Sequence, residues 1–449
     1  MDNSSPIKSF SIYGLFGISD VHIPFDEPVK ILIGENGLGK TQILNIFYYT
    51  LTGNFFRLSE FNFDKLVLKF AKGEEITLEK EKIDDLIKDF DDHPMIRDLI
   101  SEIGFEQVDL FRKNIIKNKG NLRQLEAQIG HSKLLRKYPI QHLVRIFESL
   151  DGFNIKDSYL DDCKERILLA MSDFEILYFP TFRRVEEDLH NLGYDEDDRL
   201  NQEDTIIQFG MDDVTRKFKS IENKIDRLLK DGFSKISSEI LSQLIEDEKV
   251  DEQNFLHNVD ENDIEILLSR VGDRISEAKK QKIKDIFLDR NTQSRDNSLN
   301  FFLKKLLEIY SLQKEVDNSV KVFRDVCNNY LINKQVFYDE SNINICIKLQ
   351  TTGKELPLSN LSSGEKQIIS MFAKIYLSEE KKRFCVLFDE PELSLSMEWQ
   401  KLLLPNIINS NKCDFLLAVT HSPFIFDNEL DCYAIGLNEY FEPSKSMAI

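Results

Sequence analysis

The chain has 449 residues, long enough to bury a large core, so we expect two lobes or a head with an insertion. Its 58 Lys and Arg against 78 Asp and Glu give a net charge of −20, which argues against a protein that coats nucleic acid non-specifically. We find no apolar run long enough to cross a bilayer, no signal-peptide core after Met1, and no C-x-x-C among the six cysteines. We therefore expect a soluble, cytoplasmic protein with reduced thiols.

A phosphate-binding loop is the clearest motif in the chain. Residues 7–33 fall into short apolar bursts that favour strands, and the last burst leads into Gly-Glu-Asn-Gly-Leu-Gly-Lys-Thr at 34–41. Gly34 and Gly39 let the backbone turn its N–H groups inward, as an anion site at the start of a helix over 41–51. The lysine of such a loop contacts the β- and γ-phosphates, and the threonine hydroxyl ligates Mg²⁺. The predicted nucleotide ligands are Asn36, Gly37, Gly39, Lys40, Thr41 and Gln42, of which Thr41 also serves the metal.

The next part of the chain contains a hairpin and then a helical region. Residues 65–70 and 75–80 flank Ala-Lys-Gly-Glu and predict two antiparallel strands. From about 82 to 172 the pattern is mainly helical, and the stretch 111–145 is rich in Lys and Arg with few acids. This basic stretch is either a solvated helix face or a surface that contacts a nucleic-acid backbone.

The middle of the chain returns briefly to a strand and then becomes helical again. An apolar run at 174–179 predicts the strand, and an acidic, loop-like segment follows it at 186–204. Apolar residues at helical spacing over 213–246 and 263–330 predict a helical insertion, a short hairpin rather than a long coiled-coil arm. From Gln335 onward strands return.

A second helix N-terminus with exposed hydroxyls follows these strands. The sequence Leu-Ser-Ser-Gly-Glu-Lys-Gln at 361–367 precedes apolar residues at helical spacing. Serine hydroxyls and free N–H groups at such a helix start favour phosphate. The residues that we expect to contact nucleotide here are Ser362, Ser363, Gly364 and Glu365.

Two apolar strands near the C-terminus end in polar residues. The run 384–389 ends in two carboxylates, of which Asp389 is expected to hold Mg²⁺ and Glu390 to polarise the attacking water. The run 415–420 places His421 at its carboxyl end, where α/β sheets hold ligand-contacting residues. A lone histidine there is often a capping or core residue, but its order after the other motifs favours a γ-phosphate sensor.

In this order, the phosphate loop, the serine-rich signature, the Asp-Glu strand and the histidine resemble an ABC-type P-loop ATPase head, and within that class the SMC/RecF-like and OLD-like ATPases. Residues 178–186, 209–211 and 389–392 are similar to the PtuA family, the ATPase subunits of Septu anti-phage systems, and to related retron-associated ATPases. The signature reads Ser-Ser-Gly-Glu where transporters have Ser-Gly-Gly-Gln. No Q-loop glutamine is identified, and the stretch around Pro180 is a candidate for its place.

This resemblance implies an α/β ATPase head with a mostly helical insertion, which uses ATP and Mg²⁺. It implies a homodimer of heads or a higher homo-oligomer that regulates a partner HNH endonuclease in phage defence. Separately from the resemblance, the basic stretch 111–145 is the candidate surface for nucleic acid, and the lack of a spanning apolar run predicts no membrane partner. No histidine pair has metal-ligand spacing and no Toprim domain is expected, so we expect no nuclease centre in this chain. Two alternatives stay open: a RecF/SMC-like DNA repair or recombination ATPase, and an ATP-locked oligomeric scaffold.

The motifs also suggest domain boundaries. We expect the N-terminal part of the head at 1–82, a helical insertion at 83–172, a strand returning to the head at 173–182, an acidic loop with a second helical insertion at 183–334, and the C-terminal part of the head at 335–449.

Overall fold

The computed structural model describes residues 5–35, 37–91, 158–180, 211–246, 261–270, 276–288 and 297–444. Contacts divide the chain into two compact units, Met1–Gln208 with Glu380–Ile449, and Phe209–Glu379. The predicted basic stretch 111–145, the acidic segment 186–204 and Asn36 lie outside the described residues. Within the described ranges, no helix is long and apolar enough to span a membrane.

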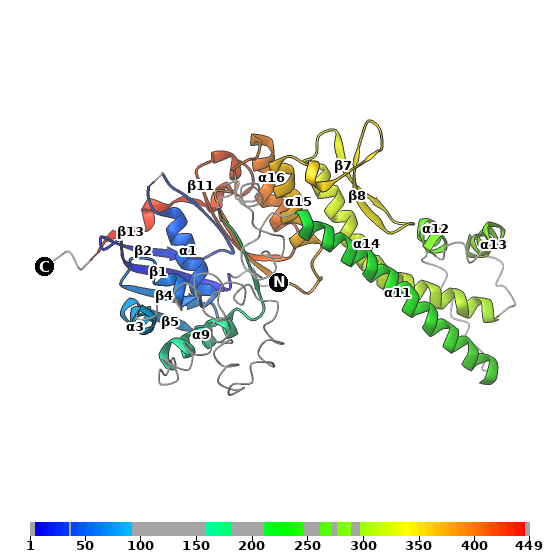
Figure 1. The fold of residues 1–449 in the computed structure, drawn as a ribbon, viewed down its shortest axis with the longest axis horizontal. Helices are drawn as coiled ribbons and strands as arrows, with labels where there is room; N and C mark the ends of the chain where they lie inside the picture. The colour runs from blue at the N-terminus through cyan, green and yellow to red at the C-terminus, as the bar shows by residue number, and fades with distance from the viewer. Residues whose placement is uncertain are drawn as a thin grey trace, which may run out of the picture. The chain divides into compact units, whose positions relative to one another are not determined.

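The first unit combines two sheets with the helix that follows the phosphate loop (Figure 1). Its strands and helices are, in chain order, β1 (Ile7–Leu15), β2 (Ser19–Pro24), β3 (Val29–Ile33), α1 (Lys40–Leu51), α2 (Phe55–Leu58), β4 (Lys65–Phe70), β5 (Glu75–Glu79), α3 (Lys80–Asp91), α9 (Ser158–Ala170), β6 (Glu175–Phe179), β10 (Phe384–Asp389), α16 (Met397–Ile408), β11 (Cys413–Thr420), β12 (Ala434–Gly436) and β13 (Phe441–Pro443).

A parallel sheet with the strand order β12-β3-β11-β10-β6 carries the sequence motifs. All of β10 is buried, as is β11 from Phe415 to Thr420, and this burial on both faces explains why the two strands are continuous apolar runs. In the register, Asp389 pairs with Val419 and Thr420 pairs with Ile33. The end of β10, the end of β11 and the phosphate loop after β3 therefore lie together at one edge of the sheet.

An antiparallel sheet, β13-β2-β1-β4-β5, shares a hydrophobic core with the parallel sheet. The predicted hairpin is confirmed, because β4 pairs with β5 in antiparallel register. Phe47 of α1 contacts both sheets: its ring centroid lies 4.9 Å from that of Phe10 in β1 and 6.2 Å from that of Phe415 in β11. This packing holds α1, and with it the phosphate loop, against the edge where the motifs meet.

The second unit is mostly helical and contains one small antiparallel sheet, β7-β8-β9. Its elements are α11 (Met211–Glu246), α12 (Glu261–Arg270), α13 (Glu277–Leu288), α14 (Asn297–Asn328), β7 (Lys334–Asp339), β8 (Asn344–Leu349), β9 (Glu355–Leu356) and α15 (Ser363–Tyr376). The predicted helical insertion thus contains α11 and α14, which lie side by side (Figure 1). They approach closely at Gly232, where a Cβ atom would stand 2.4 Å from the Cδ1 of Ile309.

The small sheet and the signature helix belong to this second unit rather than to the first. The side chain of Asn328, at the end of α14, accepts a hydrogen bond from the N–H of Val336 at 2.7 Å, which joins the helix to β7. Tyr330 packs edge-on against Phe372 of α15, with ring centroids 5.4 Å apart. The chain is therefore an α/β head with a large helical insertion, as the fold class predicted from the motifs requires, while the domain boundaries drawn from the sequence stay predictions.

Candidate functional site

The phosphate loop joins β3 to α1 through two glycines in the left-handed region. Gly37 has φ 92° and Gly39 has φ 75°, values that side chains rarely adopt, and Gly39 is also the N-cap of α1. No side chain caps this helix start. Free N–H groups and the positive end of the helix dipole are therefore available to an anion, as the sequence predicted for a phosphate site.

Lys40 begins α1 and is held from several sides. Its ammonium donates hydrogen bonds to the carbonyl oxygens of Gly34 (2.8 Å) and Glu35 (3.0 Å), and Nε2 of His421 lies 2.5 Å away. Only 5% of the residue is exposed. Burial lowers the pKa of Lys40 from its ordinary value, and the carboxylates of Glu390, Asp389 and Glu392, at and just after the end of β10, act in the opposite direction. The lysine is thus placed beside the strand ends that carry the other predicted site residues.

The two predicted metal ligands face each other. The hydroxyl of Thr41 donates a hydrogen bond to Oδ1 of Asp389 at 3.1 Å. Asp389 ends a fully buried strand and is 2% exposed, whereas Thr41 is exposed at the start of α1. Two hard oxygen donors from different elements therefore meet at the mouth of the phosphate loop.

Glu390 and His421 lie next to each other beyond the two strand ends. Oε1 of Glu390 is 3.4 Å from Nε2 of His421, and the N–H of Glu390 donates to the carbonyl of Val419 at 2.8 Å. Glu390 has φ 50°, a left-handed backbone at a residue other than glycine. Such strain costs on the order of 1 kcal/mol or more and is typical of functional sites. The turn directs this carboxylate to the same edge of the sheet as Lys40.

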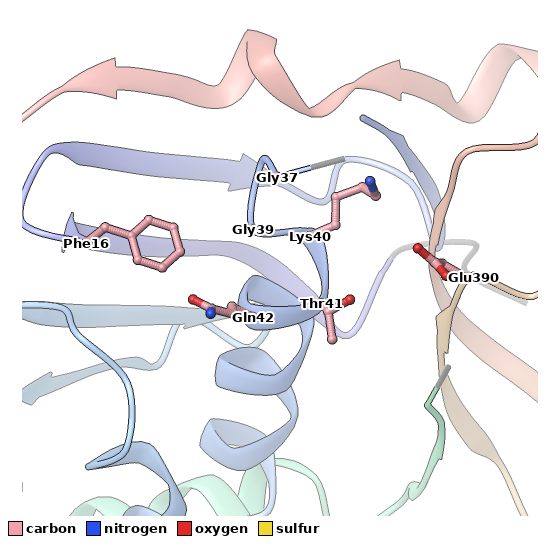
Figure 2. A pocket seen from close by; sticks show the side chains of 7 residues that line it. All are labelled: Phe16, Gly37, Gly39, Lys40, Thr41, Gln42 and Glu390. Atoms are coloured by element: carbon pink, nitrogen blue, oxygen red, sulfur yellow. The ribbon is translucent and has the colours of Figure 1, made fainter. Parts of the chain in front are cut away.

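A cavity of about 490 Å³ opens beside the phosphate loop (Figure 2). The residues that line it are Phe16, Gly37, Gly39, Lys40, Thr41, Gln42 and Glu390. The ring of Phe16 lies on one side of the loop and the carboxylate of Glu390 on the other, with Lys40 and Thr41 between them (Figure 2). Six of the seven lining residues were predicted from the sequence, and Phe16 was not.

Phe16 comes from the turn between β1 and β2. It has φ 57°, is 38% exposed, and its ring carbons lie 3.0 Å from the place where a Cβ on Gly39 would stand. A large aromatic ring with a strained backbone, half open to a polar cavity, is suited to stack on a planar ligand. The signal for this role in the sequence is slight: one phenylalanine flanked by glycines in Gly-Leu-Phe-Gly at 14–17, which reads as an ordinary turn.

The signature residues gather at the start of α15 in the second unit. Ser362 is the N-cap and forms a capping box with Glu365: Ser362 N–H and Oγ–H donate to Oε2 at 2.8 and 2.9 Å. Lys334 of β7 donates to both carboxylate oxygens of Glu365 at 2.8 Å. Burial raises the pKa of Glu365, but the hydrogen bonds from Lys334 and Ser362 together bring it below the usual value. The glutamate therefore fixes the helix start, and Ser363 is exposed beside it.

Comparisons with known proteins place the chain in a family. The model of the AAA ATPase domain matches residues 6–426. No curated protein sequence matches the chain.

Among solved structures, the chain is similar to the Smc head domain of Pyrococcus furiosus with an extended coiled coil, bound to the C-terminal domain of ScpA (10% identity, TM-score 0.38, covering 98% of this chain and 97% of that one). It is also similar to an Smc head bound to the C-terminal winged-helix domain of ScpA (11%, 0.33, 99% of each chain). A third similar structure is the Smc head domain with a coiled coil and joint from Pyrococcus yayanosii (14%, 0.31, 94% and 93%). Because the AAA ATPase domain model covers most of the sequence, this chain belongs to the AAA ATPase domain family.

Proposed function

We propose that the chain binds and hydrolyses ATP at the carboxyl edge of its parallel sheet, and that the reaction controls a partner protein. One observation carries the hydrolysis: the phosphate-loop lysine, the Thr41–Asp389 pair and the Glu390–His421 pair meet at this edge from separate parts of the sequence. A hydrolase of a phosphoanhydride needs a cation, a pair of metal ligands and a base in such proximity. Membership of an ATPase family supports the same reading.

The substrate would lie across the cavity with its phosphates in the loop. The N–H groups at the start of α1 would receive the phosphate oxygens, and Lys40 would exchange its carbonyl partners for the β- and γ-phosphates. Phe16 would stack on the adenine, since its ring lies at the other side of the cavity from Glu390. This orientation brings the γ-phosphate to the carboxylate and leaves the base on the apolar ring.

Magnesium fits the residues at the mouth of the loop. Thr41 Oγ1 and Asp389 Oδ1 are hard oxygen donors 3.1 Å apart, and Mg²⁺ prefers one or two such protein ligands together with phosphate oxygens and water. Thr41 and Asp389 would hold the ion. When bound, it would neutralise charge on the β- and γ-phosphates.

Glu390 is the proposed general base. Its carboxylate would accept a proton from a water molecule whose oxygen attacks the γ-phosphorus. The bond between that phosphorus and the β–γ bridging oxygen breaks, and ADP and phosphate leave. Lys40 would stabilise the negative charge that gathers on the leaving oxygen, while His421, beside both Lys40 and Glu390, would contact the γ-phosphate.

We further propose that the site is completed by a second copy of the chain. The signature residues Ser362 and Ser363 lie in a different unit from the phosphate loop, and in ATPase heads of the resembled class they close over the nucleotide of a partner head. A head-to-tail dimer with two-fold symmetry would then enclose two ATP molecules. ATP would favour this closed form because it contacts both chains.

The proposed output is the regulation of a partner HNH nuclease in phage defence. The support for it is the resemblance of 178–186, 209–211 and 389–392 to the ATPase subunits of Septu systems. Of these, 181–186 and 209–210 lie outside the described residues. Co-purification with the product of the neighbouring gene, followed by nucleic-acid cleavage assays with and without ATP, tests this part. Cleavage that is indifferent to ATP and to Glu390→Gln would contradict it.

The substitution Glu390→Gln tests the hydrolytic site. Glutamine keeps the shape of the side chain but cannot take a proton at neutral pH, so we expect ATP affinity within about threefold of wild type and a loss of turnover of about 10²–10⁴-fold. Calorimetry measures the affinity and phosphate release measures turnover. Glu398→Ala, an exposed carboxylate on α16, is the matched control and should leave both unchanged. Turnover at the wild-type rate in Glu390→Gln would exclude Glu390 as the base.

A further inference from the structure

Glu392 lies two residues beyond Glu390, yet its carboxylate points to a different set of partners. Oε2 accepts a hydrogen bond from the hydroxyl of Thr420 at 2.8 Å, and Oε1 accepts one from the N–H of His421 at 2.8 Å. Both oxygens are therefore held by the last residue of β11 and the residue after it. The loop after β10 and the loop after β11 are tied together by this single side chain.

A second link closes the connection into a ring. The amide nitrogen of Gln400, on α16, donates to the carbonyl of Glu392 at 3.3 Å and to that of Leu395 at 3.0 Å. Its amide oxygen accepts a hydrogen bond from the hydroxyl of Ser422 at 2.6 Å. Ser422 N–H in turn donates to the hydroxyl of Thr420 at 3.0 Å. The ring thus runs from Glu392 through the β11 loop to α16 and back.

The members of this ring are mostly shielded from water. Thr420 is fully buried and Gln400 is 8% exposed, so their polar groups would be costly to leave without partners. The bonds to Thr420, to the N–H of His421 and to Ser422 hold the backbone on both sides of His421, and those from Gln400 hold the loop after β10. Because buried networks of this kind are rigid when all members are satisfied, the ring sets where the imidazole stands relative to Glu390.

We infer that Glu392 is a positioning residue, which affects ATP hydrolysis by holding His421 in a fixed position beside Glu390. The inference rests on the proposed role of His421 at the γ-phosphate. Glu392 is not among the residues that line the cavity beside the phosphate loop, and both of its carboxylate oxygens accept hydrogen bonds. Its charge raises the pKa of Lys40 less than the charges of Glu390 and Asp389 do. A glutamate whose oxygens already accept hydrogen bonds is poorly suited to take a proton from water, but it can hold the backbone that donates to it. Its role therefore differs from that of Glu390.

The distinction predicts how conservative and non-conservative changes differ. Glu392→Gln keeps both links, because its amide oxygen can accept from the His421 N–H and its amide nitrogen can donate to Thr420, whose hydroxyl turns. We expect kcat within about threefold of wild type. Glu392→Ala removes both links, and we expect kcat to fall about tenfold to hundredfold with KM changed less than about threefold, since small displacements of a catalytic group have effects of this size.

The experiment is a double-mutant cycle with steady-state ATP hydrolysis by the full chain. It uses Glu392→Ala, His421→Ala and the double variant, with Glu392→Gln as the conservative variant, Glu398→Ala as the matched control, and thermal unfolding to follow folding. If Glu392 acts through His421, Glu392→Ala adds less than about twofold to the loss already caused by His421→Ala. Should Glu392→Ala fail to fold, Thr420→Val takes its place in the cycle. It removes one of the two links of Glu392, together with the bond from Ser422 N–H, and leaves the link to the N–H of His421.

The outcomes separate this inference from the function on which it rests. Independent, multiplying effects of Glu392→Ala and His421→Ala would overturn it, as would Glu392→Gln losing as much turnover as Glu392→Ala, which is the behaviour of a base. Unchanged kcat in Glu392→Ala, while His421→Ala is impaired, would also overturn it and leave the sensor role standing. Unchanged kcat in His421→Ala would instead contradict the proposed role of His421, and the inference would fall with it.

Discussion

At the scale of single residues, Lys40 has the largest part in the proposed ATP site. The ammonium is the one cation among the residues that line the described cavity, and its removal leaves the phosphates with backbone N–H groups alone. We predict that Lys40→Ala weakens Mg·ATP binding by about tenfold to a hundredfold, the loss expected for a hydrogen-bonded charge pair. Calorimetry checks this, with Lys8→Ala, an exposed lysine of β1, as the control. Unaltered affinity in Lys40→Ala would remove the phosphate-loop assignment.

Phe16 gives a second prediction at this scale. If its ring stacks on adenine, Phe16→Ala should weaken ATP and ADP binding by a similar factor, about tenfold for the loss of one base–aromatic contact. Inorganic triphosphate has no base and should bind the variant as well as it binds wild type. Phe16→Leu keeps apolar volume but has no π face, so its affinity for ATP should lie between those of wild type and Phe16→Ala. Equal weakening for ATP and for triphosphate would mean that Phe16 shapes the loop rather than the base site.

These residues differ in how far the sequence could predict them. Lys40 and Thr41 follow a glycine loop of fixed spacing, and Glu390 directly follows an apolar strand, so local patterns were enough to single these residues out. Phe16 and Lys334 carry no such pattern, because their roles arise from contacts with Gly39 and Glu365 that are distant in the chain. The role of Glu392 was likewise hidden, since its partners lie on a different strand.

At the scale of elements, the central strands of the parallel sheet could be predicted from the sequence, because both of their faces are buried. Residues 384–388 of β10 and 415–419 of β11 are uninterrupted apolar runs, and polar residues follow each run directly. The order of the strands in the sheet could not be predicted from the sequence. β6 pairs with β10 and β12 pairs with β3, and in both pairs the partners are far apart in the chain. The placement of the small sheet β7-β8-β9 in the second unit depends on side-chain contacts such as Asn328 with Val336, which no periodicity reveals.

The start of α15 gives a prediction about an element. Lys334→Met removes the charge that holds Glu365 and keeps the apolar stem, so the capping box should loosen. Because the pKa of Glu365 lies below its usual value, the cap persists until the pH falls through that lowered pKa. Without the charge of Lys334 the pKa of Glu365 should be higher, so in Lys334→Met the cap should be lost at a higher pH than in wild type. We expect faster amide hydrogen exchange in the first turn of α15 and slower ATP turnover, with nucleotide affinity at the phosphate loop unchanged.

The control for this change is Lys354→Met, an exposed lysine near the same small sheet. It should leave both the exchange rates and turnover as in wild type. Lys334→Arg keeps the charge and the two carboxylate contacts, and should restore most of the protection. If Lys334→Met exchanges and turns over like wild type, the bond between β7 and the signature helix has no part in the cap.

At the scale of the whole molecule, the motifs are divided between two compact units. The phosphate loop, Glu390 and His421 belong to the first unit, and Ser362 with its capping box belongs to the second. Such a division suits a protein in which ATP links one chain to another, because a ligand that contacts two parts favours the state in which both contacts are made. In the proposed dimer, each working site therefore takes its phosphate loop from one chain and its signature residues from the other.

The most direct measurement mixes two inactive variants, Lys40→Ala and Ser362→Arg, and follows ATP hydrolysis. In a mixed dimer, one site combines both defects and the other combines the intact phosphate loop with the intact signature. With random pairing in an equal mixture, half of the dimers are mixed and each has one working site of two. A shared site therefore predicts recovery to about a quarter of wild-type turnover. Lys8→Ala mixed with Ser362→Arg should keep about half of wild-type turnover and controls for loss of activity on mixing. No activity above that of the separate variants, with mixed dimers confirmed by mass, would contradict the shared site.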